Sequence, residues 1–241
     1  MDPYTSSDSF FDVQDGDAPI DLWCSGTINT MSTTPSIIKR GLGVMRLTGT
    51  GSPFNEKNVY VNAGTLLVDN ASGAGTGKAT ARVAAGATLS GTGFIGGVAT
   101  YSNANVIATG ASGNLAVIAP GTIDPTSGAH IYGTLHVGSA TQTNNVTFGN
   151  YSQFRVAIGK NRQADQLDVY GSVDLSSLTD NLMLTVDPDA KGGIYTLISA
   201  TEGITGTFNT LAVDFPKPGQ LSYTATTVDY NIVNSTVIVV R

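Results

Sequence analysis

Three carboxylates near the start of the chain are the first residues with a chemical possibility. Asp12, Asp15 and Asp17 surround a glycine in the segment DVQDGDAP. Carboxylates gathered beside a glycine turn can wrap Ca²⁺. The spacing differs from that of an EF-hand loop, and no later glutamate is placed to close one. A solvated acidic turn is therefore the preferred interpretation, with Ca²⁺ binding as the alternative.

Catalytic groups are the second possibility. Glycoside hydrolysis needs two carboxyl groups that face the same bond, and a serine hydrolase needs a histidine beside its serine. Asp165 and Asp168 in ADQLDV are an odd number of residues apart, so on one strand they point to opposite faces. His130 and His136 are the only histidines, and no distinctive motif surrounds either. We therefore expect no enzyme activity, and no cofactor.

The composition restricts the function classes further. The chain has 241 residues, of which 12% are charged and 41% are hydrophobic, with 29 glycines and a net charge of −6. Soluble domains usually carry about a quarter of charged residues, so exposed helices should be few. The acidic balance excludes the basic surface that nucleic-acid binding requires. No apolar run reaches the roughly 18 residues of a transmembrane helix. The single Cys24 excludes an internal disulfide, and we expect it to be a small buried apolar residue.

A short phrase recurs along the chain. It has apolar residues at its third and fifth positions and usually begins with glycine. The copies are GVMRL from Gly43, GTLLV from Gly64, GNLAV from Gly113, GTLHV from Gly133, SQFRV from Ser152 and GSVDL from Gly171, with GATLS from Gly86 shifted by one residue. Successive copies begin 19 to 27 residues apart. Such spacing is typical of one coil of a β-solenoid.

The two apolar positions of each phrase share one face of a strand. The pairs expected to point inward are Met45/Leu47, Leu66/Val68, Ala87/Leu89, Leu115/Val117, Leu135/Val137, Phe154/Val156 and Val173/Leu175. If all phrases stack on one face, the outward row reads Arg46, Leu67, Ala116, His136, Arg155 and Asp174. That row contains no pair of carboxylates, which disfavours a carbohydrate-active β-helix enzyme, the third and least favoured function.

The sequence divides into three regions. Residues 1–21 form an N-terminal extension, residues 22–180 the parallel β-helix, and residues 181–241 a C-terminal region of longer alternating strands. We expect this last region to be an antiparallel β cap, because an uncapped solenoid exposes a hydrophobic strand edge. The predicted fold is all-β: a parallel β-solenoid with a C-terminal cap.

The segment IIKRGLGVMRLTGTGSPFNEKNVYVNAGTLLVDN resembles the autotransporter-associated β-strand repeat of bacterial surface proteins. Its pattern runs Lys-x-Gly-x-Gly-x-x-x-Leu-x-Gly and then Val-x-x-Gly-x-Leu, and the matching residues are Lys39, Gly41, Gly43, Leu47, Gly49, Val61, Gly64 and Leu66. Later segments, from VAAGATLSGTGFIGG to the last strands, are similar in order to the end of such passenger regions. The resemblance implies a right-handed parallel β-helix, located outside the cell or on the bacterial surface, that acts as stalk, adhesin or matrix material.

Assembly is the function that we expect from these observations. Solenoid ends are templates for another strand, so they are either capped or polymerise. Two apolar segments are candidates for such an interface: Phe10 and Phe11 near the start, and Ile232, Val237, Ile238, Val239 and Val240 near the end. The expected partner is another copy of the chain, joined head-to-tail in a filament by strand addition. The alternative is an adhesin stalk that binds glycans or surfaces.

Overall fold

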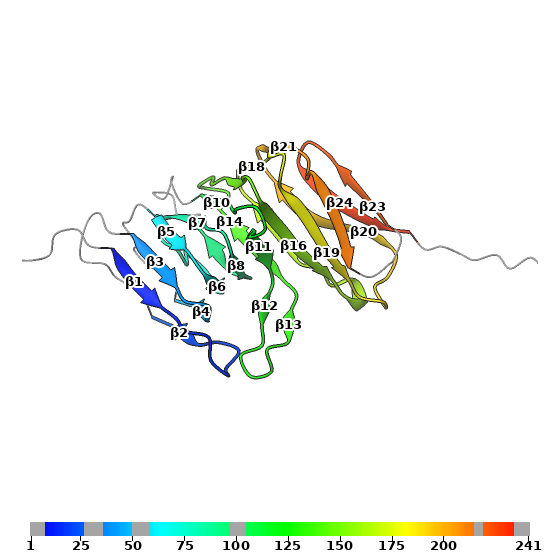
Figure 1. Cartoon of the computed structure of the whole chain (residues 1–241). Coiled ribbons are helices and arrows are strands. Elements are labelled where there is room, and N and C mark those ends of the chain that lie inside the picture. The colour runs from blue at the N-terminus through cyan, green and yellow to red at the C-terminus, as the bar shows by residue number, and fades with distance from the viewer. Residues whose placement is uncertain (1–7, 27–35, 50–57, 97–104, 215–218, 234–241) are drawn as a thin grey trace, which may run out of the picture.

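The computed structural model describes residues 8–26, 36–49, 58–96, 105–214 and 219–233. Within these ranges, every regular element is a strand except the short 3₁₀ turn η1 (Lys160–Arg162). The strands follow one another along one direction, from β1 at one end to β23 and β24 at the other (Figure 1). The prediction of an all-β fold is confirmed.

Two parallel sheets of eight strands each form the body of the molecule. Sheet A consists, in spatial order, of β1 (Ser9–Asp12), β3 (Ile37–Arg40), β5 (Asn58–Val61), β7 (Thr80–Val83), β10 (Val106–Ala108), β15 (Val146–Phe148), β18 (Ser172–Leu175) and β21 (Gly203–Gly206). Sheet B consists of β2 (Leu22–Cys24), β4 (Val44–Leu47), β6 (Gly64–Val68), β8 (Ala87–Gly91), β11 (Ala116–Pro120), β16 (Ser152–Ile158), β19 (Asn181–Val186) and β22 (Thr210–Asp214).

The chain visits the two sheets in alternation, so one strand of sheet A and the next strand of sheet B make one coil. Coil one is β1 with β2, and coil eight is β21 with β22. Val59 pairs in parallel with Ile37 on one side and with Ala81 on the other, each 22 residues away. Stacked parallel strands at this period are the arrangement expected for a β-solenoid.

A third sheet, sheet C, lies beside the later coils. Its spatial order is β9 (Phe94–Ile95), β14 (Thr134–Val137), β17 (Gln166–Val169), β20 (Gly193–Ala200), β24 (Thr227–Ile232) and β23 (Gly219–Tyr223). The first four strands pair in parallel, whereas β24 pairs antiparallel with both β20 and β23. Strands β19 to β22 pair in parallel with the coil before them, so parallel stacking extends well past residue 180, where we expected it to end.

The core consists of residues stacked in register between sheets. One column of sheet B runs through every coil and contains Leu22, Met45, Leu66, Leu89, Ile118, Phe154, Leu182 and Leu211. Members of coils two to seven are almost fully buried. Six of the seven predicted inward pairs are buried as expected, all but Leu115/Val117.

The prediction for the phrase at Gly113 is wrong by one residue. Ala116 and Ile118 face the core, and Ile118 pairs with Leu89 and Phe154. Leu115 is partly exposed, and Val117 lies on the outer face with Gln153. A one-residue displacement turns every side chain of a strand to its other face. The run LAVIA is apolar on both faces, so its alternation did not distinguish the two registers.

The phrases also do not lie on a single face. The copy at Gly133 forms β14 of sheet C and the copy at Gly171 forms β18 of sheet A, whereas the others belong to sheet B. The predicted outward row is therefore not a row in the structure. The cause is an inserted hairpin, β12 (Thr122–Ile123) and β13 (His130–Ile131), which lengthens coil five before the next phrase.

This hairpin acts as a brace along the stack. It projects from the sheets toward the loop that joins β1 and β2 (Figure 1), and a Cβ placed at Gly128 of its tip would lie 3.6 Å from Pro19. At its base, the Thr122 hydroxyl donates to Asp69 over 2.5 Å. The same carboxylate lies 2.8 Å from the Arg46 guanidinium. The brace thus connects coil five with coils one, two and three.

A buried lysine joins coils two and three. Lys39 faces the interior of sheet A, and its Nζ donates to the carbonyl oxygens of Gly41, Gly43 and Ala63 at 2.5–2.7 Å. Gly64 has a φ of +61°, and a Cβ there would lie 2.4 Å from Nζ. Because glycine alone fits that backbone and that space, the Lys39 and Gly64 of the repeat pattern belong to one structural unit.

Replacing this lysine tests the unit. We expect Lys39→Met to lower the free energy of unfolding by about 2 kcal/mol or more at pH 7, because three buried carbonyls lose their donor. The midpoint of urea unfolding measures this, with the exposed Lys191→Met as the control. An unchanged midpoint for Lys39→Met would contradict the structural role.

The pH dependence gives a second readout of the same variant. Burial lowers the pKa of Lys39 to about 8, against the opposing charges of Asp21 and Asp12. Between about pH 8 and the ordinary lysine value of 10.5, the unfolded chain binds more protons than the folded chain. This group therefore makes the wild-type stability rise with pH across that window, and Lys39→Met should lack that contribution.

Candidate assembly surfaces and polar clusters

The first coil leaves one edge of sheet A and one edge of sheet B without a partner strand among the described residues. Strand β1 pairs only with β3, and β2 pairs only with β4. Phe10 on the outer face of β1 is 53% exposed, with the Arg40 guanidinium 4.2 Å from its ring centre. Phe11 points the other way and packs partly against the core. The two predicted interface residues therefore have different environments.

Sheet B presents a second aromatic residue at this end. Trp23 of β2 is 52% exposed, and its indole N–H donates to the Thr48 hydroxyl over 2.9 Å. The Arg46 guanidinium of the next coil lies 4.8 Å from the Trp23 ring centre. Cys24 points toward the core and is partly exposed, and burial raises the pKa of its thiol, which makes it unreactive at neutral pH.

The last coil is open in the same way. In the described part of the chain, β21 pairs only with β18, and β22 pairs only with β19. Leu211 and Val213 continue the inner columns of sheet B, yet they are 42% and 38% exposed because no further coil covers them. Sheet C covers part of this end, where Leu221 and Tyr223 of β23 pack against the core.

The predicted interface residue Ile232 lies inside the fold rather than on a surface. It is 2% exposed, and it pairs with Gly193 of β20 and with Gly219 of β23. Val237, Ile238, Val239 and Val240 lie outside the described residues. The exposed apolar residues of this end, Leu211 and Val213, were missed by the sequence analysis. Their signal was the alternation of TLAVD, the next strand of the sheet B series after NLMLTV.

The acidic segment does not form an ion site. Asp12, Asp15 and Asp17 are exposed, and Asp12 accepts a hydrogen bond from the Gln14 side chain over 2.7 Å. No three acidic, histidine or cysteine side chains come together as a possible metal site anywhere in the described ranges. Asp21 instead organises the loop, since its carboxylate accepts from the backbone N–H groups of Gly16 and Val44 at 2.8 and 2.7 Å.

The outer face of sheet C carries a polar row. Asp168 accepts from the Ser199 hydroxyl at 2.6 Å, and its other oxygen lies 3.1 Å from Nδ1 of His136. The Phe94 ring stacks on His136 with centres 4.6 Å apart. The hydrogen bond with His136 is the main cause that lowers the pKa of Asp168. Because the carboxylate lies between the serine and the histidine, the histidine does not contact the serine and no serine nucleophile is activated.

Asp165 belongs to a different cluster. It is buried, accepts from the backbone N–H groups of Gly133 and Ala157 at 3.2 and 3.0 Å, and lies 3.0 Å from His130. These bonds join the base of the β12–β13 hairpin to β16. Asp165 therefore fixes backbone, while Asp168 lies on the outer face of sheet C, and the two carboxylates do not act as a pair.

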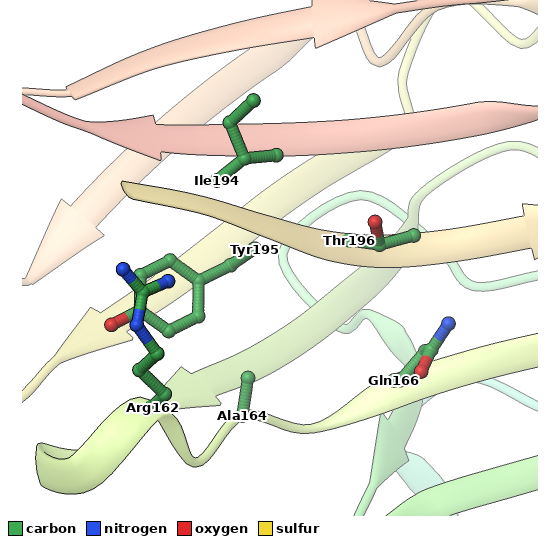
Figure 2. Close-up of a pocket in the computed structure, with 6 residues that line it drawn as sticks. All are labelled: Arg162, Ala164, Gln166, Ile194, Tyr195 and Thr196. Carbon is green, nitrogen blue, oxygen red and sulfur yellow. The ribbon is translucent and has the colours of Figure 1, made fainter. Parts of the chain in front are cut away.

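A shallow cavity of about 290 Å³ lies between η1 and β20 (Figure 2). Its lining residues are Arg162, Ala164, Gln166, Ile194, Tyr195 and Thr196. Arg162 donates to the Gly192 carbonyl over 3.1 Å, and the Tyr195 hydroxyl donates to the Lys191 carbonyl over 2.6 Å. The lining contains one cation and no carboxylate, so it suits a polar ligand better than acid–base catalysis.

Comparison with known proteins adds no further assignment. The chain matches no model of a known protein family and no curated protein. No helix in the described part of the chain is long and apolar enough to cross a membrane.

A buried carboxyl group lies beside the last coil. Asp180 has no exposed surface; its Oδ1 accepts from the Asn209 N–H over 3.1 Å, and its Oδ2 has no hydrogen-bond partner among the described residues. Burial raises the pKa of Asp180 to about 6, against the lowering effect of its backbone hydrogen bonds. At neutral pH this carboxylate is therefore a source of instability next to β22.

Removing its charge should stabilise the protein. We expect Asp180→Asn to raise the unfolding midpoint at pH 7 and to change it little near pH 4. Between the unfolded pKa of about 3.9 and the folded value of about 6, the folded state binds the extra proton. The contribution of Asp180 to stability is therefore lost as pH rises through this window. Thermal unfolding at both pH values measures the effect, with the exposed Asp189→Asn as control; equal shifts in both variants would refute it.

Proposed function

We propose that the protein is an extracellular or bacterial surface structural protein without catalytic activity, a subunit that assembles head-to-tail into a filament by strand addition. The observation that carries the proposal is the pair of open ends. In the described residues, coil one and coil eight each leave two parallel strands unpaired on one side, with exposed apolar residues on or beside them. Unpaired edges of this kind readily accept further strands.

The resemblance to the autotransporter-associated β-strand repeat belongs to the same proposal. It assigns a right-handed winding to the coils and an exported setting to the chain. The Lys39 cage supports it, because the cage explains why lysine and glycines recur together in that pattern. In this proposal, β23 and β24 cap only the side of sheet C, and Val237 to Val240 are a further candidate segment for donation to a neighbour.

Electron microscopy with sedimentation over a concentration series tests the assembly. We expect wild-type filaments of regular width that grow with concentration. Leu211→Lys with Val213→Lys should raise the concentration needed for assembly at least about tenfold, because both charges would be buried at the joint. Ile194→Lys, an equally exposed apolar site on sheet C, is the matched control.

Two results would overturn or refine the proposal. Monodisperse particles at all concentrations would overturn it. Filaments from a chain that ends at Val233 would exclude Val237 to Val240 as the donated strand while keeping head-to-tail assembly.

The second candidate function is an adhesin stalk that binds glycans. The cavity with Arg162, Gln166 and Thr196 favours it, since amide, hydroxyl and guanidinium groups suit a hydroxylated or acidic sugar. If this is correct, Arg162→Gln should weaken binding to immobilised acidic polysaccharide several-fold and leave binding to a neutral one unchanged. Absence of wild-type binding to either would exclude this function.

A further inference from the structure

The two open ends of the stack have matching directions and matching columns. In sheet B the continuous inner column begins at Leu22 and ends at Leu211. In sheet A the corresponding column begins at Ser9 and ends at Ile204, with every step between them in parallel register. Because all these strands run in the same direction, coil eight of one copy presents the edge that coil one of another copy would continue.

We propose that neighbouring copies join in the register that continues these columns: β22 pairs in parallel with β2 of the next copy, and β21 with β1 of the next copy. This inference rests on the proposed head-to-tail assembly and names its joint. In sheet B it places Leu211 beside Leu22 and Val213 beside Cys24 of the next copy. All four are apolar, and the first column residue on each side is partly open to solvent in the single chain.

Side-chain size in sheet A fits the same register. Ile204 would meet Ser9 of the next copy, a large residue against a small one. Gly206, which has no side chain, would meet Phe11 of the next copy, the largest inner residue of coil one. Each large side chain therefore finds space on the other side of the joint, as packing at protein density requires.

The outer face of sheet B fits as well. Trp23 contacts Arg46 of its own second coil on one side of its ring, and 52% of its surface remains exposed. In the proposed register, its other neighbour is the small Ala212 of the preceding copy. The joint would thus cover an aromatic residue that the single chain leaves open.

Other registers are less compatible. A shift by one residue would turn Leu22 and Cys24 away from the core of the neighbouring copy. A shift by two residues in one direction would place Ile204 against Phe11, two large side chains in one position. Since sheets A and B belong to one body, a register must satisfy both at once.

Cysteine cross-linking tests this register directly. Cys24 is the only cysteine of the chain, so Val213→Cys creates one cysteine at each end. Directly paired Cα atoms in neighbouring strands lie about 4.8 Å apart, within the roughly 4.4–6.8 Å that a disulfide spans. We expect mild oxidation of assembled Val213→Cys to give a ladder of dimers, trimers and longer covalent chains on a non-reducing gel.

The matched control is Ala212→Cys, whose side chain points to the opposite face of the same strand. It should give at least about tenfold less cross-linked product than Val213→Cys. A second pair, Leu22→Cys with Leu211→Cys in a Cys24→Ser background, should give the same ladder and guards against a folding defect in the first variant. Circular dichroism and sedimentation establish that each variant is folded and assembled.

The outcomes separate the register from the function. Filaments without the Val213→Cys ladder, or with an equal ladder from Ala212→Cys, would overturn the register and leave head-to-tail assembly standing. Variants and wild type that remain monomeric would overturn both. Dimers alone, without longer products, would indicate head-to-head contact through Cys24 and also overturn the register.

Discussion

Parallel pairing between successive coils is the interaction on which the rest of this structure depends. Each strand of sheets A and B obtains its backbone partners from strands about 20 to 40 residues away, and the same pairing places equivalent side chains one above another. The inner columns, the Lys39 cage and the hairpin brace all require that register. The same requirement leaves the first and last coils incomplete, so the property that builds the stack also creates its two reactive ends.

Much of the fold could be predicted from short alternating phrases, because a pair of apolar residues two positions apart marks the inner face of a strand. Met45 and Leu47, or Phe154 and Val156, have polar or charged neighbours and were assigned correctly. Where both faces are apolar, as around Ala116, alternation no longer distinguishes inside from outside. The distribution of phrases over three sheets was missed because one inserted hairpin changes the distance to the next corner.

The candidate site was less predictable because it depends on what lies beside each residue. Ile232 and Leu211 both belong to alternating apolar strands, yet one is covered on both sides and the other is the last of its column. Asp180 and Lys39 look like ordinary charged residues in the sequence. Their burial follows from the coil above and below, which a single phrase does not contain.

The brace has a mechanical consequence. A stack held only between neighbours can be peeled one coil at a time from an end. Here the β12–β13 hairpin reaches from coil five back to Pro19, and its base is tied to Asp69 and thereby to Arg46. Tension applied at the first coil is therefore shared with the fifth, and the first five coils would yield as a single block. If the subunits carry load in series, the weakest segment lies beyond that block, in coils six to eight.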